Sequence, residues 1–231
     1  GEFRGKAGSM HLCSPRSGFM GSSAIVGTTI PLALGCAFVN KQKKNGSLTA
    51  VFFGDGAIDE GVFWESLNFA CLKKIPLLFV CEDNNLAIHS KSSERQGYRS
   101  ITDIIDQFDC RVIQSKSTDP EVIADLTAQG VTHSLEKGGP VFFHFKYYRY
   151  LEHVGVNEDF QFGYRSRDEF KRWQAIDPIL LQRKKLLANG YHENSIRKIE
   201  TEIIEQIEKS ILQASQAPFP PDTDLYQNVL V

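Results

Sequence analysis

The chain has 231 residues, of which 42% are hydrophobic and 23% are charged. A chain of this length and composition can bury the core of one large globular domain. Its net charge of −2 gives no electrostatic case for binding nucleic acid or a membrane surface. No apolar run reaches transmembrane length and no secretion signal is visible, so we expect neither nucleic acid nor membrane among its partners.

The cysteines are an odd set without a Cys-x-x-Cys pair: Cys13, Cys36, Cys71, Cys81 and Cys110. Such a set is typical of reduced thiols in a reducing compartment. We therefore expect the protein in a bacterial cytoplasm or in an organellar matrix. The spacing of the cysteines does not suit a zinc site.

The first 40 residues predict a loop followed by a helix. Residues 5–21 are rich in Gly and Ser and predict the loop. Residues 22–40 predict a helix with small residues, namely Ala24, Gly27, Ala33, Gly35 and Ala37. Small residues allow close packing, and the candidates for that packing are a cofactor, another subunit and the chain's own core.

The stretch from Val51 to Leu86 predicts a strand, a helix and a second strand. Two apolar runs of strand length, residues 51–53 and 77–81, flank a segment with helical spacing of its apolar residues. A crossover of this kind gives parallel strands. Asp55 and Asn84 would then lie just past the carboxyl ends of neighbouring strands, which is the edge of an α/β sheet where ligands bind.

The residue types at this edge suit a metal and a phosphate. Asp55 offers a carboxylate and Asn84 an amide carbonyl, and both are oxygen ligands suited to Mg²⁺ or Ca²⁺. Gly54 and Gly56 allow a sharp bend and a close approach to a ligand. Residues from Gly56 onward would open the next helix and favour a phosphate there. Each motif alone is typical of an ordinary turn or loop, but together they predict a metal–diphosphate site.

The middle of the chain predicts further α/β elements. The expected elements are an exposed loop over 88–100, a helix over 101–108, a strand over 111–113, a helix over 120–137 with Asp119 as its N-cap, and a strand over 140–146. His144 in the last strand is expected in the core or at an interface rather than as a ligand.

The remainder is expected to be helical. Asp177 and Pro178 begin a helix that ends near Gly190. Isoleucines then form a stripe at helical spacing, which predicts a surface helix packed on the domain rather than a coiled coil: Ile196, Ile199, Ile203, Ile207 and Ile211. Prolines after this helix predict an extended tail.

Several motifs in order resemble the alpha subunit of thiamine-diphosphate-dependent 2-oxoacid dehydrogenases of the pyruvate, branched-chain and acetoin types. The main one is Gly-Asp-Gly at 54–56, followed about thirty residues later by Asn-Asn at 84–85. The others are Gly-Ser-Met-His at 8–11, Ala-Ile-Val-Gly at 24–27, Pro-Leu-Ala at 31–33, Tyr-Arg-Tyr at 148–150 and Tyr-Arg-Ser-Arg at 164–167.

The resemblance implies a thiamine-diphosphate-binding fold, a doubly wound and mainly parallel sheet with helices on both faces. It implies one domain over 1–231, with a Gly-rich loop (1–21), an α/β core (22–146), an active-site loop (147–167) and C-terminal helices with a tail (168–231). It also implies about a hundred further residues upstream, where a Tyr-Arg pair helps to hold the diphosphate.

The implied cofactors are thiamine diphosphate and Mg²⁺. The metal ligands would be Asp55, Asn84 and the backbone carbonyl of Leu86, which replaces the usual Tyr. Asn85 is the alternative ligand, and Asp83 stands where the family has an amide, so it either recruits a positive charge or is solvated. The cofactor contacts implied are Ala24, Val26, Gly54, Asp55, Gly56, Ala57, Asn84, Leu86 and His153.

His153 is the implied catalytic residue, in a turn that lacks the other histidine of the family pattern. A histidine suits acid–base chemistry at neutral pH, although a solvated loop histidine is the competing interpretation. Val154 and Gly163 stand at positions that are phosphorylated serines in mammalian relatives, which excludes that control here.

The implied reaction is oxidative decarboxylation of a 2-oxoacid with transfer of the acyl group to a lipoyl carrier. The implied partners are a beta subunit, in an assembly of two alpha and two beta chains, and a lipoyl-bearing acyltransferase. The beta subunit supplies the glutamate that activates the aminopyrimidine, and this chain offers no candidate for it. The alternatives are a thiamine enzyme that cleaves acetoin or transfers an aldehyde unit, and an inactive truncated interaction subunit.

Overall fold

The computed structural model describes residues 6–227, which fall into two compact units by their internal contacts. The larger unit is Ile25–Pro178, and the smaller one combines residues 6–24 with residues 179–227. The single domain expected over 1–231 stays a prediction. The first residues of the expected Gly-rich loop, 1–5, and the end of the tail, 228–231, lie outside the described residues.

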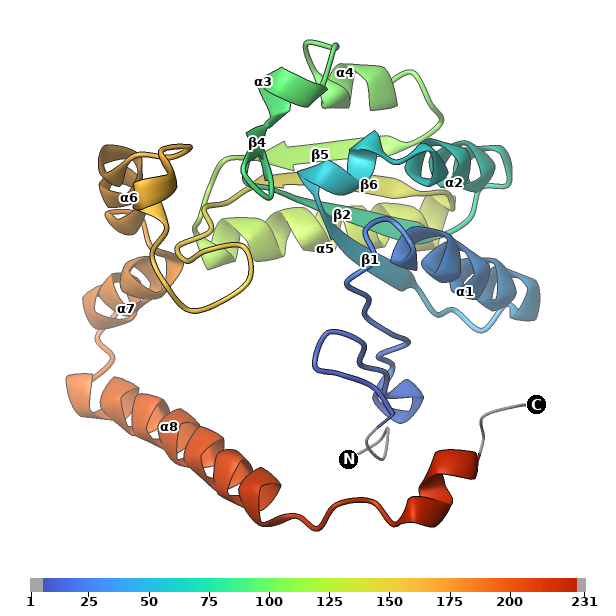
Figure 1. Ribbon diagram of the computed structural model, residues 1–231. Helices are drawn as coiled ribbons and strands as arrows, with labels where there is room; N and C mark the ends of the chain where they lie inside the picture. The colour runs from blue at the N-terminus through green and yellow to red at the C-terminus, as the bar shows by residue number, and fades with distance from the viewer. Residues whose placement is uncertain (1–5, 228–231) are drawn as a thin grey trace. The chain divides into compact units, whose positions relative to one another are not determined.

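A parallel sheet forms the centre of the larger unit (Figure 1). Its strands lie in the order β1 (Thr49–Gly54), β2 (Leu77–Asp83), β6 (Val141–Lys146) and β5 (Arg111–Ser115). All three strand pairs are parallel. The helix α2 (Gly61–Leu72) connects β1 to β2, so the predicted strand–helix–strand crossover is confirmed.

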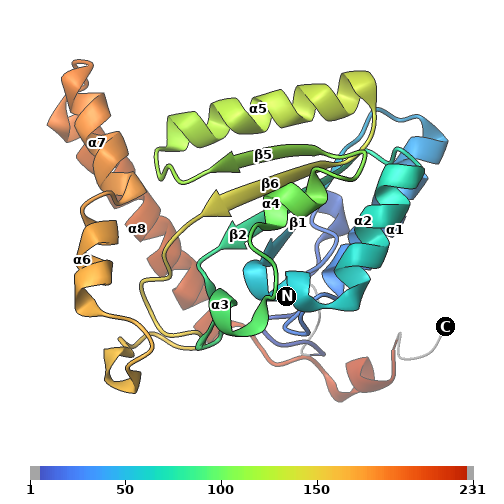
Figure 2. The same ribbon diagram turned by 90° about the horizontal axis from the view of Figure 1, so that it is seen from above.

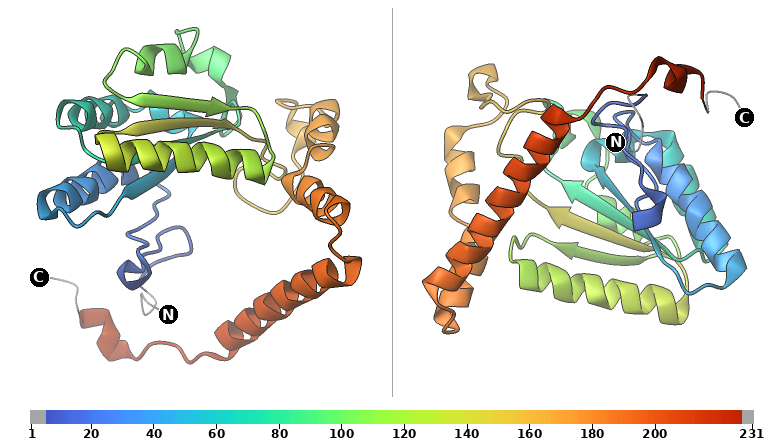
Figure 3. Two further views of the ribbon diagram at one scale, coloured as in Figure 1. Left: turned by 180° about the vertical axis from the view of Figure 1, so that it is seen from behind. Right: turned by 90° about the horizontal axis from the view of Figure 1, so that it is seen from below.

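Helices cover both faces of this sheet, which confirms the doubly wound α/β fold. On one face, α1 (Thr29–Lys43), α2 and α4 (Ile101–Ile105) pack on the sheet through a shared cluster of buried side chains. On the other face, α5 (Pro120–Lys137) packs through a second cluster around Phe143. Figure 2 shows α5 beside the sheet, and the left view of Figure 3 shows it in front of β5 and β6.

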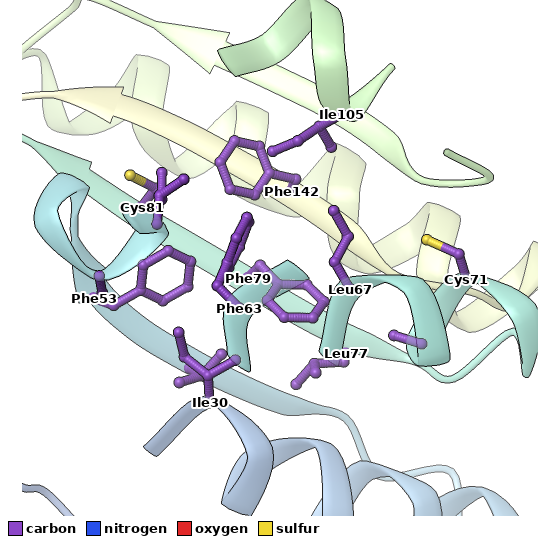
Figure 4. Close-up of a cluster of buried hydrophobic side chains, with 14 of the residues drawn as sticks. Ile30, Phe53, Phe63, Leu67, Cys71, Leu77, Phe79, Cys81, Ile105 and Phe142 are labelled. Carbon is purple, nitrogen blue, oxygen red and sulfur yellow. The ribbon is translucent and has the colours of Figure 1, made fainter. Parts of the chain in front are cut away.

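Phenylalanine rings from three strands and one helix form the centre of the first cluster (Figure 4). Phe63 of α2 is fully buried, and its ring centroid lies 5.6 Å from that of Phe53, 6.1 Å from that of Phe79 and 6.1 Å from that of Phe142. Aromatic pairs at these separations add to the stability that burial alone provides. This packing fixes α2 against β1 and β2 and therefore fixes the ends of both strands.

Two predicted helix starts are wrong. The helix expected from Ser22 begins only at Thr29, because Gly27 has φ of +82°, a left-handed conformation that a helix does not continue. The helix expected to open at Gly56 begins at Gly61, and a 3₁₀ turn, η2 (Asp55–Asp59), comes first. The N-terminus of α2 therefore does not begin at the Gly-Asp-Gly motif.

The expected exposed loop over 88–100 is also wrong in part. A short antiparallel pair, β3 (Leu86–Ala87) with β4 (Ser90–Lys91), and a helical turn, α3 (Ser92–Arg95), form in this region. By contrast, α5 begins at Pro120 with Asp119 capping the backbone N–H of Glu121, as the sequence predicts. After β6 the chain continues through η3 (Phe160–Phe162) and α6 (Arg167–Gln174).

The smaller unit contains η1 (Pro15–Ser17), most of α7 (Pro178–Ala188), α8 (Glu193–Gln216) and η4 (Asp222–Tyr226). Ile196 of α8 is buried, and the four isoleucines that follow it in the stripe are each more than half exposed. The packing of this stripe on the domain stays a prediction. The tail is extended at Pro221, as predicted from its prolines, and then forms the 3₁₀ turn η4. Across residues 6–227, no helix has both the length and the hydrophobicity needed to cross a bilayer.

Candidate cofactor site

The carboxyl ends of β1 and β2 bring two aspartates side by side. The register pairs Gly54 with Glu82, so that Asp55 and Asp83 are the next residues along the two strands. Both are buried, with exposed fractions of 3% for Asp55 and 7% for Asp83. Two buried carboxylates in one place need positive partners, because an uncompensated buried charge is strongly unfavourable.

Asp55 receives one partner from a segment forty residues away in the chain. Arg95 of α3 forms an ion pair with Oδ2 of Asp55 and a second one with Asp59. The Oδ1 atom of Asp55 is buried and has no hydrogen-bond partner among the described residues. Burial and the negative charge of Asp83 raise the pKa of Asp55, whereas the charge of Arg95 opposes the rise. One oxygen of the carboxylate is thus paired with Arg95, and the other is available to bind a cation.

Asp83 receives its partners from β6. Its Oδ2 atom lies 2.6 Å from Nε2 of His144 and forms an ion pair with Lys146, while its Oδ1 accepts a 2.7 Å hydrogen bond from the backbone N–H of Asn85. Burial alone would raise the pKa of Asp83, but these hydrogen bonds and the charge of Lys146 lower it to about 2. Asp83 recruits positive charge, as one of the two alternatives predicted. His144 is half-buried and contacts this carboxylate rather than serving only as core.

The turn after β2 holds the side chain of Asn84 in a fixed orientation. Its Oδ1 accepts a 2.9 Å hydrogen bond from the backbone N–H of Leu86, and its Nδ2 donates to the hydroxyl of Tyr147 at 3.1 Å. The neighbouring Asn85 has φ of +66°, and its own amide oxygen accepts from Ser92. The amide oxygen of Asn84 keeps a second lone pair for a metal.

The chain turns directly from β1 into η2 at the motif, and neither Gly54 nor Gly56 has a positive φ, so this turn uses no left-handed glycine. Gly56 is needed for close packing instead: a Cβ atom there would lie 2.9 Å from the Cβ of Ala87. Ala57 is buried with an exposed fraction of 4%. Gly56 therefore lets η2 sit directly against β3, which carries Leu86.

The two residues expected at the aminopyrimidine lie in different units. Ala24 belongs to the smaller unit, so its place at the cofactor stays a prediction. Val26 belongs to the larger unit and is exposed in the turn before α1. In that turn, a Cβ atom on Gly27 would lie 3.2 Å from the side chain of Glu60, just past η2. The backbone around Val26 is therefore close to the segment that follows Asp55.

The loop after β6 is organised by a buried ion pair that sequence inspection missed. Asp159 has no exposed surface, and Arg165 donates to it from Nε at 2.7 Å. The hydroxyl of Tyr164 also donates to Asp159, and Arg165 donates further to the backbone carbonyls of Arg149 and Tyr150. Burial raises the pKa of Asp159, but the hydrogen bonds and charges outweigh it and leave that pKa below its usual range.

His153 is exposed on this loop, and its Nδ1 lies 3.4 Å from Nη1 of Arg149. Partial shielding of the ring from water, followed by the charges of Arg149 and His89, lowers the pKa of His153. His89 comes from the turn between β3 and β4 and stacks on Tyr164 with ring centroids 4.3 Å apart. Sequence inspection missed His89, because no local pattern marks a contact with a loop so distant in the chain.

A small cavity lies between the turn after β2 and the loop after β6. Its lining includes Asn84 and Leu86 from the turn after β2, and Tyr148, Arg149 and Tyr164 from the loop. The structure thus brings the expected ligands Asn84 and Leu86 to a shared cavity with the Tyr-Arg-Tyr motif.

The oxygen donors at the strand ends fit a hard divalent cation. Asp55 offers its buried Oδ1, which no described residue contacts by a hydrogen bond, and Asn84 offers an amide oxygen that the adjacent turn holds in place. Hard cations such as Mg²⁺ take oxygen ligands and commonly use only one or two carboxylates. Among residues 6–227, no three His, Cys, Asp or Glu side chains gather into a metal-binding group, so a site here relies on amide and backbone oxygens as well.

Comparisons with known proteins agree with the resemblance seen in the motifs. A model of the dehydrogenase E1 component family matches residues 1–222. The proteins named pyruvate dehydrogenase E1 component subunit alpha from Zymomonas mobilis and Rickettsia conorii are 33% and 29% identical to this chain over 98% of its length. The mitochondrial subunit of that name from Pisum sativum is 32% identical over 99%.

The chain spans 64%, 69% and 57% of the lengths of these three relatives, respectively. The match nevertheless covers nearly all of this chain and is not confined to the Gly-Asp-Gly motif. The chain belongs to the dehydrogenase E1 component family.

Proposed function

We propose that this chain is the alpha subunit of a thiamine-diphosphate-dependent 2-oxoacid dehydrogenase. The observation that carries the proposal is the buried carboxylate of Asp55 at the carboxyl ends of two parallel strands, beside the Asn84 turn. One of its oxygens has no partner within residues 6–227. This is the edge where α/β sheets bind ligands. The names of the relatives, which are alpha subunits of pyruvate dehydrogenase, support the same function and favour pyruvate as the substrate.

In this proposal Asp55, Asn84 and the carbonyl of Leu86 hold Mg²⁺, which binds the diphosphate. The backbone of Gly54, Gly56 and Ala57 lines the diphosphate side, and Ala24 and Val26 face the aminopyrimidine. When bound, thiamine diphosphate supplies a carbon nucleophile and an electron sink for loss of CO₂. The chain itself binds, orients and shields the cofactor.

His153 moves protons in the proposed site. Because its pKa lies below the usual value, its imidazole is mostly neutral at pH 7 and can accept a proton at Nε2 or Nδ1. Arg149 lies near Nδ1 and does not accept a proton, so Nε2 is the nitrogen better placed to exchange one with a substrate. The buried Asp159–Arg165 pair orders the loop that presents His153.

The proposed partners are a beta subunit, in an assembly of two alpha and two beta chains, and a lipoyl-bearing acyltransferase. The proposed location is a bacterial cytoplasm or an organellar matrix, and the mitochondrial relative from Pisum sativum is consistent with the second. Activity would require the beta subunit, because the glutamate that activates the cofactor belongs to it in this family.

The test is 2-oxoacid decarboxylation with an artificial electron acceptor, measured for this 231-residue chain alone and for the alpha chain assembled with its beta subunit. We expect turnover only in the assembly, with pyruvate, branched-chain 2-oxoacids and acetoin compared as substrates. Turnover by the isolated chain would contradict the split site. An assembly that binds thiamine diphosphate but turns over none of these substrates would contradict the proposed reaction.

A further inference from the structure

Arg95 is the one positive side chain that contacts Asp55 among the described residues, and it does so with the fork of its guanidinium group. Its Nη2 pairs with Oδ2 of Asp55 and its Nη1 pairs with Oδ2 of Asp59. Nε donates to the carbonyl of Ser90 at 3.4 Å, and Gln96 donates to the other oxygen of Asp59 at 3.1 Å. A planar guanidinium held at three points leaves the bound carboxylate little freedom to rotate.

The two carboxylate oxygens of Asp55 therefore have different surroundings. Arg95 pairs with Oδ2, and the buried Oδ1 has no hydrogen-bond partner in the part of the chain that the structure describes. The carboxylate side chain is only 4% exposed, so water does not readily satisfy the free oxygen. A buried acceptor without a partner is costly, and such an atom at a ligand site indicates that a ligand completes it.

The segment that carries Arg95 is itself attached to the second half of the proposed metal site. The backbone N–H of Ser92 donates to the carbonyl of Asn85 at 3.1 Å, and the hydroxyl of Ser92 donates to the side chain of Asn85. The N-terminus of α3 is closed by Glu94, which accepts from the backbone N–H of Lys91. Arg95 therefore spans from the turn next to Asn84 across to Asp55.

We propose that Arg95 is a positioning residue for the magnesium ligand Asp55: it holds Oδ2 so that Oδ1 faces the metal. This inference rests on the proposed metal site and adds a residue to it. Partners that orient a metal ligand typically change metal affinity by about 10- to 100-fold when they are removed. Arg95 acts on the metal only through Asp55 and does not itself bind it.

The test uses Mn²⁺ as a spectroscopic probe for the metal. Binding of Mn²⁺ to the assembled protein with thiamine diphosphate present is titrated by electron paramagnetic resonance, for the wild type and for Arg95→Met. We expect the variant to bind Mn²⁺ about 10- to 100-fold more weakly. Arg99→Met, which removes an exposed arginine from the same segment, is the matched control and should bind as the wild type does.

Further variants keep the test decisive if Arg95→Met folds poorly. Arg95→Lys keeps the charge but not the fork, so its Mn²⁺ affinity should lie between those of the wild type and Arg95→Met. Asp59→Asn loosens Arg95 while leaving Asp55 intact, and should weaken binding by a smaller factor. In steady state we expect a raised KM for Mg²⁺ with a kcat near that of the wild type at saturating metal, a split that simple misfolding does not give.

The outcomes separate this inference from the proposed function. A wild type that binds Mn²⁺ together with an Arg95→Met variant of equal or tighter affinity would overturn the positioning role alone, because Arg95 would then be neutral or would compete with the metal. A wild type that binds no Mn²⁺ in the presence of thiamine diphosphate would overturn both the metal site and the positioning role.

Discussion

Replacing Arg165 by methionine should release the loop that presents His153. In the folded loop the Arg165 side chain is 2% exposed and its partner Asp159 is fully buried. Removal of one member of a buried ion pair costs about 3–5 kcal/mol, because the other charge stays buried without compensation. Tyr164 still donates to Asp159, and Arg149 lies 3.7 Å away, so we expect the lower end of this range.

A cost of about 3 kcal/mol corresponds to roughly a 100-fold rise in the open population of the loop. Hydrogen exchange reports this directly at the amides of Phe162 and Gly163, which donate to the carbonyls of Asp159 and Phe160. We expect their exchange to accelerate about 100-fold, while amides in β2 stay protected. Because the pKa of Asp159 is lowered from 3.8, the stabilising charge is fully present above about pH 4, so the measurement belongs at pH 5 or higher.

Two control variants test whether the buried charge causes the effect. Arg172→Met, which removes an exposed arginine of α6, should change exchange little. The double variant Asp159→Asn with Arg165→Met leaves no buried unpaired charge and should recover part of the lost protection. Exchange at the wild-type rate in Arg165→Met, or a double variant no better than the single one, would refute the reasoning.

Three further predictions concern the loop and the core. His153→Ala should leave cofactor affinity nearly unchanged but lower kcat by about two to four powers of ten, measured by steady-state kinetics of the assembly. Wild-type turnover in this variant would show that His153 is an ordinary solvated loop histidine. Burial and then Arg149 lower the pKa of His153, so we expect Arg149→Met to move the acid limb of the kcat/KM profile to higher pH. An acid limb at the same pH in both proteins would show that His153 does not cause it. Gly130→Ala places a Cβ atom 2.3 Å from the ring of the buried Phe143. We expect urea unfolding to show a loss of stability of about 1–3 kcal/mol, although alanine favours the helix by about 1 kcal/mol. Unchanged stability would show that the ring can move.

The crossover from β1 to β2 could be predicted because its signals are local. Two apolar runs, a helical spacing between them and polar residues at both strand ends are all present within 36 positions of the sequence (86 − 51 + 1). The positions of Asp55 and Asn84 followed from parallel strand geometry alone. The start of α1 did not follow: Gly27 has a left-handed conformation and lies close to Glu60, a contact that the local sequence does not indicate.

The charged partners of the site could not be predicted, because each ion pair depends on how the chain folds rather than on a local sequence pattern. Arg95 lies in a polar segment that is typical of an exposed loop, and nothing in its local sequence indicates the ion pair with Asp55. Asp159 and Arg165 are close in sequence, yet their burial results from the way the loop folds back on Arg149 and Tyr150. Asp83 is intermediate: the sequence left open whether it recruits a positive charge or is solvated, and did not indicate that β6 supplies the charge.

The isoleucine stripe of α8 shows that a sequence pattern can predict an element without predicting what packs against it. The helical spacing was correct, and α8 forms over Glu193–Gln216. Spacing alone does not say which surface covers an apolar face, and four of the five isoleucines are exposed in the described residues.

The central claim is that Asp55 anchors Mg²⁺ and, through it, thiamine diphosphate. Isothermal calorimetry of thiamine diphosphate binding, with and without Mg²⁺, tests it for the assembled wild type and for Asp55→Ala. We predict Mg²⁺-dependent binding by the wild type and none detectable for the variant, since Asp55 is the one carboxylate expected on the metal. Equal affinity of the variant and the wild type would contradict the site.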